Sequence, residues 1–318
     1  MQRTPCAVVG VGYVGRFHAQ KYAAHEHAEL VAVVDIDPAT AERVASECGC
    51  EALTDYRGLL DRVEAVSIAV PTVRHFAIAR EFLARGIHVL LEKPMTSTIE
   101  EARELNRLAR DTGAALQIGH LERFNAAFRD IAGIRPRPLF IESHRVAPFK
   151  PRGTDVSVVL DLMIHDIDLI LGLVDSPIRT LSASGTPVLS DDLDIVNARL
   201  EFESGCVANV TASRVSVKSE RRMRIFQPEA YISIDFQNAS VAVHRIGAGE
   251  MMPGVPEILR EESTFDSNDS IHSEIDAFLG SVRQHKPVVV SGEDGLRALE
   301  TAVRISALID AERLRHAG

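Results

Sequence analysis

The feature that most constrains this chain lies at its beginning, where a short apolar run enters a glycine-rich turn. Residues 7–9 lead into GVGYVG at 10–15, a helical segment follows, and a second apolar run at 30–34 ends at Asp35. In such a unit the first glycine allows a tight turn, the second lets the backbone approach a diphosphate, and the third lets helix and strand pack closely. Free amides at the helix start would face the phosphate charge. The segment is therefore predicted to bind a dinucleotide.

Asp35 and its neighbour indicate which dinucleotide is bound. Asp35 lies twenty residues after Gly15, where a carboxylate binds the hydroxyls of the adenosine ribose. The same carboxylate would repel a 2′-phosphate, and Ile36 supplies no positive charge to offset it. We therefore favour NAD over NADP.

Strands and helices alternate through the first 120 residues. Apolar runs at 63–70, 87–91 and 114–118 are separated by helical segments, and Thr98 with Glu101 forms a capping box for one of these helices. Thr72 is expected to cap another. This alternation is typical of an α/β fold with a doubly wound parallel sheet, whose strand ends line one crevice. Residues 1–120 are therefore predicted to form a Rossmann domain.

The pattern changes in residues 121–318, for which we predict an α+β domain. Alternating polar and apolar residues and tight turns indicate an open, largely antiparallel sheet. The expected strands are 139–145, 178–186, 195–202, 206–215, 221–226, 230–235 and 240–245. An apolar helix is expected at 156–173, and two terminal helices at 271–284 and 293–313. The Gly-, Pro-, Ser- and acid-rich stretch 246–269 is interpreted as a mobile loop.

Composition excludes several classes of partner. Lys and Arg total 35 against 45 Asp and Glu, which gives a net charge of 35 − 45 = −10 and argues against a nucleic-acid binder. The four cysteines form no CxxC pair and are interpreted as free thiols in a reducing compartment. The apolar stretches are too short to cross a bilayer. We therefore expect a cytoplasmic protein with neither nucleic acid nor membrane as a partner.

Three residues stand out as candidates for chemistry. Lys93 follows a strand at the carboxyl edge of the predicted parallel sheet, and Asp161 and His165 lie four residues apart on an apolar helix, where they share a face. Titratable groups are costly to bury there without a purpose. A metal site is an alternative interpretation, but it has no obvious third ligand, and none is predicted.

These motifs together resemble the glucose-fructose oxidoreductase and inositol dehydrogenase family, Gfo/Idh/MocA, across nearly the full chain. The matching pieces are GVGYVG at 10–15, VPTVRH at 70–75, EKP at 92–94, GHLERFN at 119–125, DLMIHDIDL at 161–169 and VSGEDG at 290–295. Met163 departs from the pattern, because most members carry a small residue at that position.

The resemblance implies a hydride-transfer enzyme that uses NAD. Its catalytic residues would be Lys93, His165 and Asp161, with Asp161 orienting a substrate hydroxyl. Either His165 or Lys93 could accept the hydroxyl proton, and we favour His165 because the ordinary pKa of histidine lies near neutrality. The cofactor-binding residues would be Gly10, Gly12, Tyr13, Val14, Gly15, Asp35, Ile36, Val70, Pro71, Thr72, His75, Glu92, Lys93 and His120.

Within the family, the chain most resembles the branch that oxidises the 3-hydroxyl of UDP-N-acetylglucosamine, whose keto product an aminotransferase then aminates in lipid A assembly. A diphosphate needs positive partners. The predicted substrate-binding residues are Arg123, Asn125, Arg145, Lys150, Arg152 and Asp161. Myo-inositol, a free aldose and a UDP-hexuronate are alternative substrates, and a non-catalytic NAD-sensing regulator is an alternative of another class. Open sheet faces in this family usually pair between subunits, so the resemblance also implies a homodimer or homotetramer.

Overall fold

The computed structural model describes residues 3–131, 134, 136–149, 157–265 and 269–316. The chain divides into two compact units. The first consists of Met1–Leu121 and Asp269–Leu299, and the second of Glu122–Asn268 and Glu300–Gly318. Sequence periodicity placed all of 121–318 in the second domain, whereas in the structure 269–299 pack with the first unit.

The first unit is built on a six-stranded parallel sheet. The sequence predicted a parallel sheet with five of these strands, and the short strand at 51–53 was not expected. Its strands are β1 Thr4–Val9, β2 Ala28–Val34, β3 Glu51–Leu53, β4 Ala65–Ile68, β5 His88–Glu92 and β6 Leu116–Gly119. They lie in the order β3-β2-β1-β4-β5-β6. The order reverses between β1 and β4, and ligands of such sheets bind beside the carboxyl ends of the strands at this point.

Capping residues define most helix ends in this unit. The helices are α1 Tyr13–Ala24, α2 Pro38–Cys48, α3 His75–Leu83, α4 Ile99–Thr112 and α7 Ser270–Gln284, with 3-10 turns η1 Tyr56–Leu59 and η2 Thr72–Arg74. The capping box of Thr98 and Glu101 is present, as predicted. The expected cap at Thr72 is wrong, because Thr72 begins η2 and α3 starts after Arg74 without a side-chain cap.

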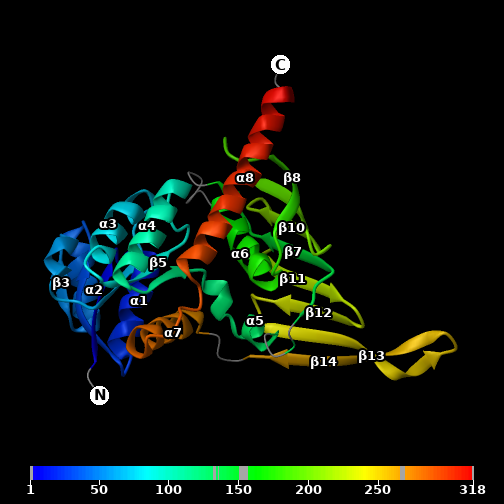
Figure 1. Ribbon diagram of the computed structural model, residues 1–318, viewed down its shortest axis with the longest axis horizontal. Helices are drawn as coiled ribbons and strands as arrows, with labels where there is room; N and C mark the ends of the chain where they lie inside the picture. Colours follow the sequence, from blue (N-terminus) through cyan, green and yellow to red (C-terminus); the bar gives the residue numbers. More distant parts are fainter. Residues whose placement is uncertain (1–2, 132–133, 135, 150–156, 266–268, 317–318) are drawn as a thin grey trace. The chain divides into compact units, whose positions relative to one another are not determined.

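Helix α7 completes the core of the first unit, although it comes late in the chain. It packs against α1 (Figure 1). Ile275, Phe278 and Leu279 of α7 belong to one buried cluster with Tyr22 of α1 and Val8 of β1. Burying a side chain of this size contributes about 1.5–3 kcal/mol. A helix from late in the sequence therefore completes the hydrophobic core beside the Rossmann sheet.

The second unit contains an eight-stranded, mostly antiparallel sheet. The sequence predicted a largely antiparallel sheet with seven of these strands, and the eighth, at 255–264, lies in the stretch interpreted as a loop. Its strands are β7 Phe140–Val146, β8 Ile178–Thr186, β9 Ile195–Phe202, β10 Val207–Ser213, β11 Glu220–Gln227, β12 Ala230–Asp235, β13 Ser240–Met252 and β14 Val255–Thr264. They lie in the order β14-β13-β12-β11-β7-β10-β9-β8. Only the pairing of β7 with β10 is parallel among the strand pairs described.

Helices cover this second sheet. Helix α6, Ile164–Leu173, packs on β7 and β10, and α5, Ala126–Ile131, packs on β12 and β13. A 3-10 turn, η3 Leu121–Phe124, precedes α5, and the long α8, Gly292–His316, ends the chain. No helix among the described residues is long and apolar enough to cross a membrane.

The expected mobile loop at 246–269 is wrong for the part that the structure describes. Strands β13 and β14 pair through this region as a long hairpin (Figure 1). Its turn contains Pro253 and Gly254, and Gly254 has φ +79°, as the second central residue of a type II turn requires. Glycine, proline and acidic residues suggested a loop, but the Pro-Gly pair is itself a turn signal between two strands.

The apolar helix expected at 156–173 is interrupted. A π-helical turn at Val159–Met163 precedes α6. Such turns often mark functional positions. Asp161 lies within this turn and His165 lies in α6, so the angular offset between them differs from that of two residues in one regular α-helix.

Candidate active site

At two positions of the glycine turn after β1, the surrounding backbone leaves no room for a side chain. Gly10 has φ +84°, and a Cβ built there would lie 2.7 Å from the backbone oxygen of Ala69. A Cβ on Gly15 would lie 1.8 Å from the oxygen of Gly10. Strand, turn and helix are thereby held in close contact, which is what a backbone cradle for a diphosphate requires.

The start of α1 is available to an anion. Gly12 is its N-cap residue, no described side chain caps the helix there, and a Cβ on Gly12 would meet nothing within 4 Å. The first amides of a helix lack partners within the helix and attract negative charge. This end of α1 therefore fits a diphosphate.

Asp35 and the apolar residues near it fit the rest of a dinucleotide. The Asp35 carboxylate follows β2 and accepts hydrogen bonds from the amides of Val11, at 3.0 Å, and Asp37, at 3.1 Å. Large apolar side chains lie exposed after the strand ends: Tyr13 at 71%, Ile36 at 93% and Val73 at 76%. A nucleotide bound beside them would cover this apolar surface.

His75 connects two of the predicted cofactor-binding segments. It is buried, and its ring nitrogens lie 2.9 Å from the carbonyl oxygen of Val70 and 3.0 Å from that of Pro94. Burial lowers the pKa of His75, although the two carbonyls act in the opposite direction. His75 thus ties the segment after β4, which continues into Pro71 and Thr72, to the segment that carries Lys93.

Lys93 lies immediately after β5, before a cis peptide bond to Pro94. Its amide donates to Oε2 of Glu92 at 3.3 Å. Burial opposes ionisation of Glu92, but His18, whose Nε2 lies 3.3 Å from Oε1, and the charge of Lys93 together lower the pKa of this carboxyl. Lys93 therefore has an ionised acid as its direct neighbour.

The end of β6 packs closely against this acid. Gly119 pairs with Glu92 across the sheet, and a Cβ on Gly119 would lie 3.0 Å from Cδ of Glu92. His120 follows and is buried. The sequence-predicted cofactor residues from β1, β2, β4, β5 and β6 thus all lie at the carboxyl edge of one sheet.

The second unit carries the other two catalytic candidates. Asp161 and His165 are each half-buried, and the amide of Asp161 donates to the oxygen of Ser157 at 2.9 Å. Met163, which lies between these two residues in the sequence, is fully buried.

Arg145 has buried acidic partners within the second unit. Its Nε lies 2.6 Å from Oδ2 of Asp166, and its Nη1 lies 2.7 Å from Oε1 of Glu122. Asp166 also accepts from the hydroxyl of Ser143 at 2.6 Å. Burial opposes the charge of Arg145, but the two carboxylates outweigh it and raise its pKa. Its charge is therefore already compensated.

Two more predicted substrate-binding residues have internal partners. Arg123 pairs with Asp168 through two nitrogens, at 2.7 and 2.8 Å. Oδ1 of Asn125 accepts from the amide of Ala127 at 3.0 Å, and its Nδ2 donates to the oxygen of Phe236 at 3.1 Å. A role of these side chains in substrate binding stays a prediction. Lys150 and Arg152 lie outside the described residues.

Two buried acids were not singled out from the sequence. Burial opposes ionisation of Asp194, but the Ser190 hydroxyl and the amides of residues 188–190 outweigh it and lower its pKa. Glu274 of α7 lies near His18 and Glu92. Neither acid has a local sequence signal, because the partners of Asp194 are mainly backbone amides and those of Glu274 are remote in the chain.

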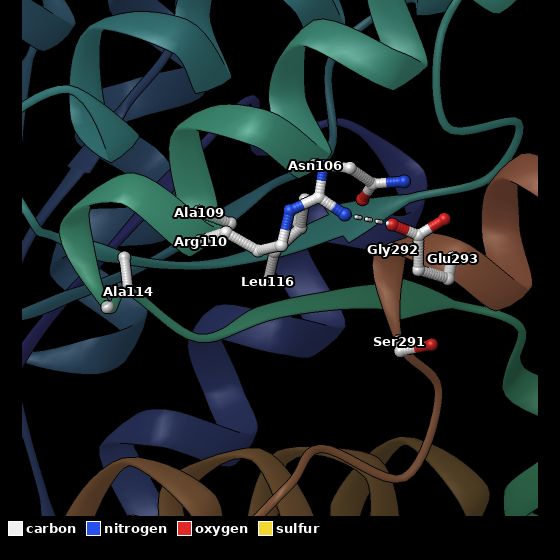
Figure 2. A pocket seen from close by; sticks show the side chains of 9 residues that line it. Asn106, Ala109, Arg110, Ala114, Leu116, Ser291, Gly292 and Glu293 are labelled. Atoms are coloured by element: carbon white, nitrogen blue, oxygen red, sulfur yellow. Dashed lines mark hydrogen bonds and ion pairs between the residues drawn. The ribbon is translucent and has the colours of Figure 1, made fainter.

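A separate pocket lies away from these residues. It has a volume of about 310 Å³ and is lined by the end of α4, the start of β6 and the start of α8. Figure 2 shows Arg110 directed toward Glu293, to which it donates at 2.8 Å. The pocket lies at the amino end of β6, whereas the glycine turn and Lys93 lie at the carboxyl ends of their strands.

Comparisons with known proteins agree with this geometry. Residues 4–120 match the model of the Gfo/Idh/MocA oxidoreductase family with an NAD-binding Rossmann fold, and residues 107–233 match the model of the Gfo/Idh/MocA C-terminal domain. UDP-N-acetylglucosamine 3-dehydrogenase from Acidithiobacillus ferrooxidans is 40% identical over 96% of both chains. Its solved structure gives a TM-score of 0.92 over 98% of this chain and 99% of that one. Inositol 2-dehydrogenase from Rhizobium meliloti is 26% identical over 93% of both.

Proposed function

Because this chain belongs to the Gfo/Idh/MocA family of NAD-binding oxidoreductases, we propose that it oxidises the 3-hydroxyl of UDP-N-acetylglucosamine to a ketone. One observation carries the choice of substrate. The relative of that name is similar over almost the whole of both chains at 40% identity, whereas the inositol dehydrogenase from Rhizobium meliloti reaches 26% over a comparable length. An aminotransferase that uses the keto sugar for lipid A assembly is the partner that this proposal implies.

The residues of the chain divide the proposed reaction between them. The amides at the start of α1 bind the diphosphate of the cofactor, and Asp35 binds its ribose hydroxyls. Bound NAD supplies the acceptor for the hydride that leaves the carbinol carbon. Lys93 polarises the substrate oxygen, Asp161 orients the hydroxyl, and His165 accepts the hydroxyl proton, so that a ketone and one proton are the remaining products.

The proposal is tested by following NADH formation with a panel of four substrates. UDP-N-acetylglucosamine is expected to give a clear signal, and UDP-glucuronate, myo-inositol and glucose much weaker ones. NADP in place of NAD serves as the control and should give little product, because Asp35 repels a 2′-phosphate. A signal with myo-inositol and glucose but none with UDP-N-acetylglucosamine would show that the substrate is a free polyol or aldose instead. NAD binding without turnover of any of the four substrates would favour the alternative that the protein is a non-catalytic, NAD-sensing regulator.

We also propose that the protein forms a homodimer or homotetramer through the β13–β14 hairpin. Strand β14 is the edge of its sheet, and unpaired edges attract further strands. The hairpin exposes six large apolar side chains, an unusual concentration for a surface. They are Ile246, Met251, Met252, Val255, Ile258 and Leu259.

Replacing Ile258 by Glu is therefore expected to lower the mass of the particle in solution. Ile258 pairs with Ile246 across the hairpin and is 49% exposed, so a charge there would remain in water in the monomer but be buried in an interface. Light scattering after gel filtration measures the mass. Glu261→Gln, on the same strand, is the matched control. An unchanged mass for Ile258→Glu would exclude this hairpin as the interface.

A further inference from the structure

Three side chains of metal-ligand type meet inside the first unit. They are His18 from α1, Glu92 from the end of β5 and Glu274 from α7, and one ligand atom of each lies within 4.8 Å of the other two. Nε2 of His18 lies 3.3 Å from Oε1 of Glu92 and 4.0 Å from Oε2 of Glu274. Ligand atoms around a tetrahedral zinc ion are about 3.3–3.5 Å apart at the usual bond lengths. Small rotations of these side chains would therefore complete such a geometry.

The atoms that face one another in this cluster are buried without hydrogen bonds. His18 is 1% exposed and Glu274 is 0% exposed. Nε2 of His18 and both carboxyl oxygens of Glu274 have no hydrogen-bond partner among the described residues. Burying polar atoms in this state is costly. A cation that accepts their lone pairs would remove this cost.

The surroundings of the cluster suit metal ligands. Nδ1 of His18 lies 3.2 Å from the hydroxyl oxygen of Ser67, which lies 2.9 Å from that of Tyr22. A metal-bound histidine usually donates its other ring N–H to a neighbouring acceptor. Ser67 can accept from Nδ1, and that tautomer leaves the lone pair of Nε2 for an ion. Nε2 of Gln117 donates to the backbone oxygen of Glu274 at 3.2 Å and so holds α7 beside β6.

The charges of the cluster couple cation binding to proton release. Burial, reinforced by the charge of Glu92, raises the pKa of Glu274 well above its ordinary value, so Glu274 is a carboxylic acid at neutral pH. The other titratable groups that act on the two carboxyl groups are Tyr22, His75 and Lys93. A divalent cation would balance two carboxylates. Its binding would therefore displace the proton of Glu274.

We propose that His18, Glu92 and Glu274 form a binding site for a divalent transition-metal ion, of which zinc fits best. Zinc accepts imidazole and carboxylate ligands together, whereas magnesium and calcium bind oxygen ligands. Glu274 can supply both of its oxygens, which brings the number of donor atoms to four. The ion would join α1, β5 and α7 and tie the late helix to the Rossmann sheet. The sequence predicted no metal site, because these residues are remote from one another in the chain.

The direct test is zinc binding by the full-length protein, prepared without a polyhistidine tag and stripped with a chelator. Titration calorimetry with zinc chloride is expected to show one site per chain. Titrations in two buffers of different ionisation enthalpy should show the release of about one proton at neutral pH. Zinc should also raise the melting temperature by several degrees, because it binds the folded chain. Magnesium chloride should do neither. Absence of a stoichiometric zinc site would overturn the proposal.

Two conservative variants locate the bound zinc. His18→Gln and Glu274→Gln should each weaken zinc binding by more than about 100-fold, because even a residue that only supports a ligand contributes about 10–100-fold. Glu274→Gln should also abolish the proton release. His27→Gln, which alters a histidine whose side chain is 36% exposed, is the matched control and should bind zinc normally. Unchanged affinity in both site variants would contradict the assignment.

X-ray absorption at the zinc edge keeps the proposal testable if these variants fail to fold. The unaltered protein with one equivalent of zinc is expected to show only nitrogen and oxygen neighbours at about 2.0–2.2 Å, one of them from an imidazole. A sulfur neighbour at about 2.3 Å would assign the zinc to thiols such as the half-buried Cys48 and Cys50 and overturn the site. These measurements require no substrate, so their outcome is independent of the proposed oxidation.

Discussion

Replacing Lys93 by Ala is expected to lower kcat by about 10²–10³-fold, the usual cost of removing a group that stabilises charge at the reacting oxygen. The affinity for NADH should change by no more than about threefold, because the glycine turn and Asp35 remain in place. Steady-state NADH formation measures the first quantity, and titration calorimetry measures the second. The variant therefore separates chemistry from cofactor binding.

Two further lysine variants sharpen this experiment. Lys93→Met keeps the length of the side chain without its charge and should be as inactive as Lys93→Ala. Lys218→Ala alters a lysine that is 77% exposed and should match the unaltered protein. If Lys93→Ala turned over at the normal rate, Lys93 would have no part in the reaction.

Replacing Arg145 by Ala is expected to lower the free energy of unfolding by about 3–5 kcal/mol. The guanidinium is buried and contacts Asp166 at 2.6 Å and Glu122 at 2.7 Å. Its loss removes the buried cation from Asp166 and leaves Glu122 facing only the more distant, exposed Arg221. Urea unfolding followed by circular dichroism measures the change. An arginine that only bound substrate would instead raise KM and leave the unfolding midpoint unchanged.

Arg221 offers a matched control for this prediction. It also faces Glu122, but at 3.7 Å and with a side chain that is 55% exposed. Water screens such a pair, so Arg221→Ala should cost less than about 1 kcal/mol. Equal losses in the two variants would show that burial does not set the strength of these ion pairs.

The cofactor half of the molecule could be predicted because its signals are local. The turn at Gly10 and Gly15 requires residues without a Cβ, and the spacing to Asp35 follows from one strand–helix–strand unit. The capping box at Thr98 is likewise contained in four residues. Such features depend on neighbours in the chain, so the sequence displays them directly.

The buried polar partners could not be predicted in this way. Arg145 on β7 meets Asp166 on α6 only after the second sheet has formed. Its positive charge therefore indicated an anion pocket, whereas the fold supplies internal carboxylates. His18 and Glu274 were missed for the same reason, because α1 and α7, which carry them, are separated by most of the sequence. Sequence spacing carries no record of such contacts.

The position of α7 has a consequence for how the protein is made. The ribosome releases the sheet of the first unit early, but Ile275, Phe278 and Leu279, which complete its core, emerge only after the whole second sheet has been synthesised. Until then the apolar surface around Val8 and Tyr22 has no cover from α7. The nucleotide-binding half therefore cannot finish folding as an N-terminal fragment, and a nascent chain exposes this surface to chaperones for most of its translation.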